Sequence, residues 1–445
     1  MIKNNYSLQN KLSKDDLNLI HENTVHILEN EGIIIDNKKA LEVFKNNGIK
    51  IKDKKVYISR QRLEKIISKI PETFELKARN PEHNIEIGND NSVLGPPLGP
   101  PFIYENEDKR YGTYEDYIEL IKFYHSNPYI DLVGGDIIAP ADIDKAHRHK
   151  KMFYAAAKYS DKALLGTGSG EKEIQDILNM GRILFGEDKL KNNYYILKLV
   201  GASSPLAYNN TALNTLINLA EYSQPIAIYS QILAGITGPI TLAGLLTQQN
   251  AEILTGTVLA HLINSNTPVI YSTASSVTDM KSGNITVGNG QYAKIIAAVA
   301  QIADYYNLPS LVAGGVTDAK DTTNQAGFET MLNMYTSSGS GVDIIIYSLG
   351  SISEYLGVSY DKIRKDAAIL ETLDNFQTGI EVNKENIARK TIKEVGADNN
   401  FMTHPHTMER LQKRKGKKNN SDIKQVENYE KPFLAEKIKQ KLQEI

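Results

Sequence analysis

Apolar residues in this chain alternate between short runs of strand length and longer segments with helical spacing. Residues 226–232 and 268–272 are apolar runs rich in β-branched side chains, which is typical of buried strands. Residues 247–263 lie between them and place three apolar side chains four positions apart on one helix face: Leu254, Val258 and Leu262. A glycine-rich loop, residues 234–244, joins the first strand to this helix. The pattern predicts a βαβ unit, in which the two strands run parallel.

This unit recurs, and its recurrence predicts an α/β protein built on a (β/α)₈ TIM barrel. Seven strands are expected, at residues 130–138, 163–168, 195–202, 226–231, 269–273, 310–314 and 342–347. Helices are expected at residues 145–159, 172–185, 211–222, 248–263, 291–306, 325–338 and 360–373. The eighth strand lies either within residues 93–104 or within residues 349–353.

Segments of different character flank the barrel, which we place at residues 93–375. Residues 1–92 predict a small α/β appendage, with Ser13 as the N-cap of its first helix. The proline-rich stretch LGPPLGPP, residues 94–101, excludes helix and interior strand and marks the boundary. Residues 376–445 are polar and predict a helical C-terminal segment.

Composition narrows the class of protein. Hydrophobic residues make up 41% and charged residues 23% of the chain, as in ordinary globular proteins. Because 51 Lys and Arg balance 53 Asp and Glu, no overall field attracts nucleic acid or a membrane. We expect a cytoplasmic protein, since no apolar run approaches the roughly 20 residues of a membrane span or forms a secretory signal. The absence of cysteine excludes disulfides and thiolate nucleophiles.

Candidate chemistry is sought in the loops that follow the strands, where barrel active sites lie. These loops are rich in Gly, Ser, Thr, Asn and Tyr and lack His or Glu clusters at metal-ligand spacing, so we expect no bound metal. The chain has 24 Tyr and no Trp. Tyrosine faces at a barrel mouth would attract a quaternary ammonium group, by roughly 0.5 to 2 kcal/mol per ring. From composition alone, tyrosines that simply fill the barrel and hydrogen-bond at its rim are the favoured alternative.

Several segments resemble the corrinoid-dependent trimethylamine methyltransferase family. The most distinctive is AGITGPITLAGLLTQQNAEILTGTVLAHLIN, residues 234–264. Further similarity lies in SPLAYNN (204–210), PVIYSTASSVTDMKSGN (268–284), FMTHPHTMERL (401–411) and KARNPEHNIEIG (77–88). The chain has no pyrrolysine, the residue that the trimethylamine branch uses. It is therefore similar to the branch that demethylates quaternary amines such as glycine betaine, proline betaine and carnitine.

The resemblance implies a reaction and a partner. A methyl group would pass from a small quaternary amine to the Co(I) corrin (cobalamin) of a separate, cognate corrinoid protein, in one-carbon metabolism of the methanogenic or acetogenic type. It implies no tightly bound cofactor. A quaternary nitrogen leaves as a neutral tertiary amine without prior protonation, so no general acid is required. The amine, the partner protein and any homo-oligomer remain open.

The loop after the last strand departs from the family pattern. Family members often carry a His followed by a Gly-aromatic-Leu-Glu run, whereas here Tyr347 takes the His place, Ser351 takes the aromatic place and the acid is displaced to Glu354. Since this loop is expected to face the ligand, the departure leaves the substrate unassigned.

On the basis of this resemblance, we expect three kinds of residue at the site. The expected walls of the amine site are Tyr104, Tyr229, Tyr271 and Tyr347. The polar groups expected to orient the ligand are Gln231, Asp279 and Glu354. The glycines expected to shape the loops are Gly235, Gly238 and Gly314.

Two alternatives remain at this point. The first is a barrel lyase or aldolase with Lys198 as a Schiff-base nucleophile, since that lysine lies in an expected strand. The second is a protein that binds quaternary amines without turning them over.

Overall fold

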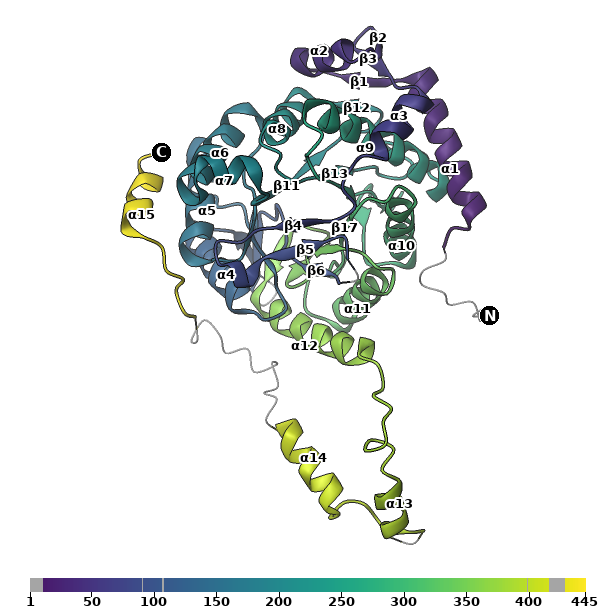
Figure 1. The fold of residues 1–445 in the computed structure, drawn as a ribbon, viewed down its shortest axis with the longest axis vertical. Helices are drawn as coiled ribbons and strands as arrows, with labels where there is room; N and C mark the ends of the chain where they lie inside the picture. Colours follow the sequence, from purple (N-terminus) through teal and green to yellow (C-terminus); the bar gives the residue numbers. More distant parts are fainter. Residues whose placement is uncertain (1–10, 90, 106–107, 398, 416–428) are drawn as a thin grey trace. The chain divides into compact units, whose positions relative to one another are not determined.

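Eight parallel strands form the central sheet of the computed structural model, which describes residues 11–89, 91–105, 108–397, 399–415 and 429–445. In chain order the strands are β6 (Val93–Leu94), β9 (Leu132–Gly134), β10 (Ala163–Leu165), β11 (Ile196–Gly201), β13 (Ile226–Ser230), β14 (Val269–Thr273), β17 (Ser310–Ala313) and β18 (Ile344–Ile346). From β9 onward each strand pairs in parallel with the next one along the chain, and β18 pairs in parallel with β6. The sheet is therefore a TIM barrel, as the sequence predicts (Figure 1).

The seam between β6 and β9 closes the ring. The Asp131 backbone N–H donates to the Leu94 carbonyl at 2.9 Å. The Leu94 N–H donates in turn to the Asp131 carboxylate at 2.9 Å, so a side chain replaces the second ladder bond. The eighth strand is thus β6, the first of the two expected positions. The other position holds β19 (Ser351–Ile352), which pairs outside the barrel with β20 (Gly357–Ser359).

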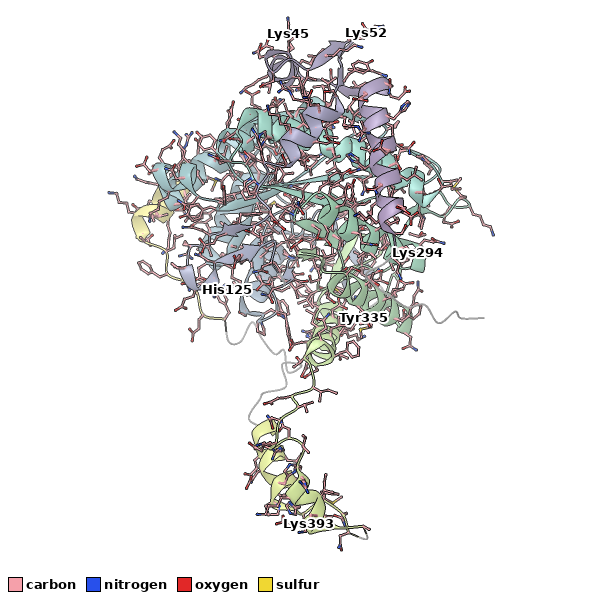
Figure 2. All side chains as sticks on the ribbon, turned by 45° about the vertical axis from the view of Figure 1, so that its right-hand side comes forward. Lys45, Lys52, His125, Lys294, Tyr335 and Lys393 are labelled. Atoms are coloured by element: carbon pink, nitrogen blue, oxygen red, sulfur yellow. The ribbon has the colours of Figure 1, made fainter. Side chains whose placement is uncertain are left out.

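Seven helices surround the strands: α4 (Tyr114–Ser126), α5 (Lys145–Tyr159), α6 (Gly170–Phe185), α8 (Asn210–Glu221), α9 (Leu242–Ile263), α10 (Gly290–Tyr305) and α11 (Asn324–Gly339). An eighth, α12 (Tyr360–Gln377), follows β20 in the chain. A short helix, α7 (Glu187–Asn192), follows α6. Seven of the eight match expected segments, and α4 was not expected. Charged side chains such as Lys294 of α10 lie on the outer surface (Figure 2).

The N-terminal elements cover part of the barrel. They are α1 (Lys14–His26), the π-helical turn η1 (Ile27–Glu31), β1 (Ile33–Ile35), α2 (Lys38–Asn46), β2 (Lys50–Lys52), β3 (Lys55–Tyr57) and α3 (Arg60–Ile67). Ser13 caps α1, as the sequence predicts. Helices α1, α2 and α3 pack on α9, whose residues 248–260 are buried without a break. A helix buried on every face has to be covered on both sides, here by the barrel and by the N-terminal helices.

Short strands complete the two ends of the barrel. The hairpin of β4 (Phe74–Leu76) and β5 (Ile85–Ile87), which the turn η2 (Pro81–His83) connects, lies at the amino end, where Lys77 N–H donates to the Tyr194 carbonyl just before β11. Beyond the carboxyl ends lie β7 (Phe102–Glu105) and β8 (Asp108–Tyr111), which join β19 and β20 in one sheet. The hairpin of β15 (Val277–Thr278) and β16 (Ile285–Thr286) also follows a barrel strand, and β12 (Ala207–Tyr208) pairs with β1.

The chain divides into two compact units. Residues 1–366 and 425–445 form the first, and residues 367–424 form the second. In the first unit, α15 (Glu436–Gln443) packs on α5 and α6. The second contains α13 (Arg389–Val395) and α14 (Pro405–Lys415). The domain limits at residues 92 and 375 stay predictions. Within the described ranges, no helix combines the length and apolar character that a membrane crossing needs.

Candidate active site

A cavity of about 580 Å³ opens at the carboxyl ends of the barrel strands. Tyr229, Tyr347 and Tyr355 stand in its wall together with Glu354, and we call it the tyrosine cavity. Its size is that of a small-molecule site, and its position is where (β/α)₈ enzymes bind their ligands.

Tyr229 reaches the cavity from β13 by lying against a glycine of the neighbouring strand. Gly201 of β11 pairs with Tyr229, and a Cβ atom at Gly201 would lie 2.6 Å from the tyrosine Cζ. The ring therefore occupies space that any other residue at position 201 would fill. Burial raises the pKa of the Tyr229 hydroxyl, so the ring stays neutral.

The loop after β18 supplies the aromatic and acidic part of the wall. Ser353, Glu354 and Tyr355 have φ of 56°, 48° and 75°, a left-handed run without glycine that is costly to hold. Backbone bonds from Ser353 to Ala319 (2.9 Å) and from Glu354 to Thr317 (3.1 Å) keep this turn in place.

The two tyrosines of this loop support one another. Their rings, Tyr347 and Tyr355, meet edge to face with centroids 4.9 Å apart. The Tyr347 hydroxyl donates to the Leu98 carbonyl in the proline-rich segment. The Tyr355 hydroxyl lies 2.9 Å from that of Tyr292, which donates to the Ala313 carbonyl at 3.0 Å. With their hydroxyls occupied, the rings are fixed and keep their faces for a ligand.

Glu354 is the acid of this wall. Its carboxylate is half-buried, and burial first, then the nearby negative charge of Asp318, raises the pKa of Glu354. Asp318 is also half-buried, and burial raises its pKa as well. Behind them, Glu329 is 5% exposed and accepts hydrogen bonds from the Thr317 hydroxyl and the Asp318 N–H. Acids packed in this way favour a cation beside them.

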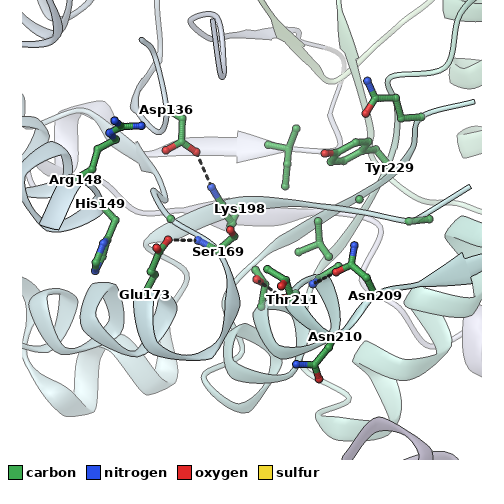
Figure 3. Close-up of a pocket in the computed structure, with 18 of the residues that line it drawn as sticks. Asp136, Arg148, His149, Ser169, Glu173, Lys198, Asn209, Asn210, Thr211 and Tyr229 are labelled. Atoms are coloured by element: carbon green, nitrogen blue, oxygen red, sulfur yellow. Dashed lines mark hydrogen bonds and ion pairs between the residues drawn. The ribbon is translucent and has the colours of Figure 1, made fainter. Parts of the chain in front are cut away.

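A second cavity of about 900 Å³, the polar cavity, is drawn in Figure 3. It is lined by charged side chains that include Lys145, Arg148 and Glu173. Five residues line both cavities: Asp136, Lys198, Leu199, Tyr229 and Gln231. The Lys198 ammonium and the Asp136 carboxylate form an ion pair of 2.9 Å at this boundary.

Two buried side chains of α9 hold the surrounding loops. The Glu252 carboxylate accepts from the Ser204 hydroxyl at 2.6 Å and from the Leu206 N–H at 2.9 Å, in the loop after β11. Gln248 donates to the Thr237 carbonyl at 3.0 Å in the loop after β13, and to Glu252 at 2.9 Å. Residues 248–252 of α9 therefore hold two loops at the mouth of the barrel, the loop after β11 and the loop after β13.

The structure brings four of the assigned residues together and places the others elsewhere. Tyr229, Gln231, Tyr347 and Glu354 line the tyrosine cavity. Tyr271 lies in β14 with its side chain fully buried against Gln249 of α9. Tyr104 packs over Gly357 in the β7 sheet. Asp279 is exposed in the turn between β15 and β16, where it accepts from the Ser282 hydroxyl at 2.8 Å.

The assigned glycines shape loops and packing. Gly235 has φ of 83°, and its N–H donates to the Gly238 carbonyl at 3.0 Å. A Cβ atom at Gly238 would lie 2.5 Å from Ile232, and one at Gly314 would lie 2.3 Å from Ile345. Side chains at these three positions would disturb the loop after β13 and the contact between β17 and β18.

Sequence reasoning did not select Tyr355, Asp136 or Tyr292. Asp136 falls inside the expected strand 130–138 and Tyr292 inside the expected helix 291–306, so only Tyr355, which follows the last strand, had a loop position as a signal. Among the residues that the structure describes, no group of three or more His, Cys, Asp or Glu is placed to hold a metal ion.

A parallel (β/α)₈ barrel with a ligand cavity at the carboxyl ends of its strands defines a barrel enzyme. The family model described as trimethylamine methyltransferase matches residues 1–443. The chain belongs to the trimethylamine methyltransferase family and is a methyltransferase.

Similar proteins include members with different amines in their names. A glycine betaine methyltransferase of Desulfitobacterium hafniense is 38% identical over 400 residues, which cover 89% of this chain and 84% of that protein. A trimethylamine methyltransferase of the same species is 30% identical, with 89% and 80% covered. A proline betaine:corrinoid methyltransferase of Eubacterium limosum is 28% identical, with 88% and 83% covered.

Proposed function

We propose that this enzyme transfers a methyl group from a small quaternary amine, of the betaine or carnitine kind, to the Co(I) of a cognate corrinoid protein. The observation that carries the proposal is the tyrosine cavity, in which Tyr229, Tyr347 and Tyr355 stand beside Glu354. Relatives named for glycine betaine and proline betaine support the same class of substrate.

A quaternary ammonium ion has no N–H to donate, so it is recognised by ring faces and by negative charge. Each well-placed ring contributes roughly 0.5 to 2 kcal/mol to its binding. Glu354, with Asp318 near it, adds a negative charge on the same wall. These groups bind a permanent positive charge without needing a hydrogen bond.

The methyl acceptor, a Co(I) corrin on a separate protein, supplies the electron pair that forms the new bond to the methyl carbon. The carbon–nitrogen bond breaks, and its pair stays on nitrogen, so a neutral tertiary amine leaves. The cavity residues then have to orient the methyl carbon toward the opening and exclude water. Gln231 stands at the cavity margin after β13 and is exposed, so it can orient a polar group of the substrate.

The rim beside the cavity offers apolar surface to a partner protein. Ile236 and Ile240 in the loop after β13 are 54% and 65% exposed, and Met280 in the adjoining hairpin is 60% exposed. The Met280 sulfur and the Ile240 side chain both lie close to Gly235, so these two exposed side chains lie together at that glycine. Exposed apolar side chains that gather at a site are typical of protein contact surfaces.

The test is methylation of free cob(I)alamin, followed by absorbance, with glycine betaine, proline betaine, carnitine and trimethylamine as donors. We expect methylcobalamin with at least one quaternary amine and none with trimethylamine, which lacks the fourth carbon substituent that makes the nitrogen permanently cationic. Tyr229→Ala should weaken binding of the active amine by roughly 1 to 2 kcal/mol. Methylation by trimethylamine alone, or by no amine, contradicts the proposal.

A further inference from the structure

The charged groups of the tyrosine cavity stand on opposite sides of the barrel. Lys198 comes from β11, and Glu354 comes from the loop after β18. In the ring order β6-β18-β17-β14-β13-β11-β10-β9, these strands are four places apart. Four places in a closed ring of eight is the far side, so Lys198, paired with Asp136, faces the acidic wall of Glu354 across the cavity.

The acidic wall also carries the rings. Tyr347 and Tyr355 flank Glu354 in the loop after β18. A trimethylammonium group is therefore best placed here, where aromatic faces and negative charge act together. Such a position leaves the rest of the substrate pointing across the cavity toward β11.

The Lys198 ammonium has N–H donors that Asp136 does not use. Its side chain is 11% exposed, and an ammonium has three N–H donors. Asp136 takes one of them at 2.9 Å, and no other acceptor in the described ranges bonds to this nitrogen. Asp136 itself is 36% exposed beside the polar cavity, so water can solvate the carboxylate oxygens that Lys198 leaves.

We infer that Lys198 binds the carboxylate that a betaine or carnitine carries, while the loop after β18 binds the quaternary nitrogen. The inference rests on the proposed function and adds the anionic half of the ligand. Lys198 is thus a specificity-determining residue, whose charge separates amino-acid betaines from simple quaternary cations.

The test compares glycine betaine and carnitine with their methyl esters, which keep the ammonium group and lose the negative charge. Affinities are measured by calorimetry on the full chain. We expect the acid to bind roughly 10- to 100-fold more tightly than its ester, the range for a hydrogen bond to a charged group. The double variant Lys198→Met, Asp136→Asn removes one charge of each sign. We expect this variant to bind the acid and its ester with equal affinity.

A matched control variant and the methylation assay distinguish failure of this inference from failure of the proposed function. Lys145→Met removes a lysine that lines only the polar cavity, and the preference for the acid should survive in it. Lys198→Gln tests the same point if the double variant does not fold. If the wild type binds acid and ester equally, or the double variant keeps the preference, the inference is wrong while methyl transfer stands. If no amine binds or methylates cob(I)alamin, both are wrong.

Discussion

Glu354 combines two features that are rare in one residue, one of its backbone and one of its side chain. Its backbone lies in the left-handed region between two other non-glycine residues, and its carboxylate is half-buried near Asp318. The structure keeps this turn through the loop after β17, which binds the Ser353 and Glu354 backbones. Because strained backbone is retained mainly where it serves a function, we expect the position of this carboxylate to matter for ligand binding.

A pH dependence follows from the raised pKa of Glu354. Above that pKa the carboxylate is charged and attracts a quaternary cation, so affinity should fall as pH falls through it. The charged groups around it are Asp318, Glu329 and Lys320. Glu354→Gln should bind roughly 5- to 30-fold more weakly at neutral pH and lose most of this dependence.

The measurement uses tetramethylammonium, which has no acidic group of its own. Its affinity is measured by calorimetry from about pH 4.5 to about pH 8, a range chosen to include the titration of a carboxyl group with a raised pKa. An unchanged pH profile in the Glu354→Gln protein would remove this carboxylate from the site.

At the scale of elements, β11 and β13 fit together through a glycine and a ring. Because the Tyr229 ring occupies the space beside Gly201, Gly201→Ala should push the ring into the cavity with little loss of stability. Amine affinity should fall by up to roughly 1 to 2 kcal/mol, the value of one ring.

A double-mutant cycle checks the cause. In a Tyr229→Ala background, Gly201→Ala should have almost no further effect on calorimetric affinity, since the displaced ring is gone. Gly327→Ala in α11, where an added Cβ meets nothing within 4 Å, is the matched control. Additive losses in the double variant would mean that Gly201 acts through something other than Tyr229.

Periodicity predicted most elements well and failed in identifiable places. The ranges of β14 and α5 agree with the structure residue for residue. Helix α4 was not expected, although its capping box at Thr113 and Asp116 is visible in the sequence. Strand β6 has two residues, too few to show any period.

The same limit applies to the tyrosines. Every residue of β14 is buried, so alternation cannot tell which face of that strand turns to the barrel interior. Tyr271 and Tyr229 therefore look equivalent in the sequence, and only the packing of α9 against β14 separates them. Residues just after strands, such as Tyr347 and Gln231, were easier to place because the carboxyl ends of all strands meet at one rim.

For the whole molecule, closure of the ring depends on the bonds between Asp131 and Leu94. Asp131→Ala removes the acceptor for the Leu94 N–H and should lower the free energy of unfolding by about 1 to 3 kcal/mol. Asp131→Asn keeps a side-chain oxygen in the same place and should lose less. Urea denaturation measures both, and an Asp131→Ala protein as stable as the wild type would show that the seam holds without this carboxylate.

Between residues 248 and 260, helix α9 turns no face to water, because α1, α2 and α3 lie on the side that the barrel leaves open. Those helices thus belong to the hydrophobic interior as much as the strands do. A shortened or chimeric enzyme without these helices would expose an apolar face of α9 to water and would tend to aggregate. Protein engineers who move this barrel into another scaffold have to carry the opening helices with it.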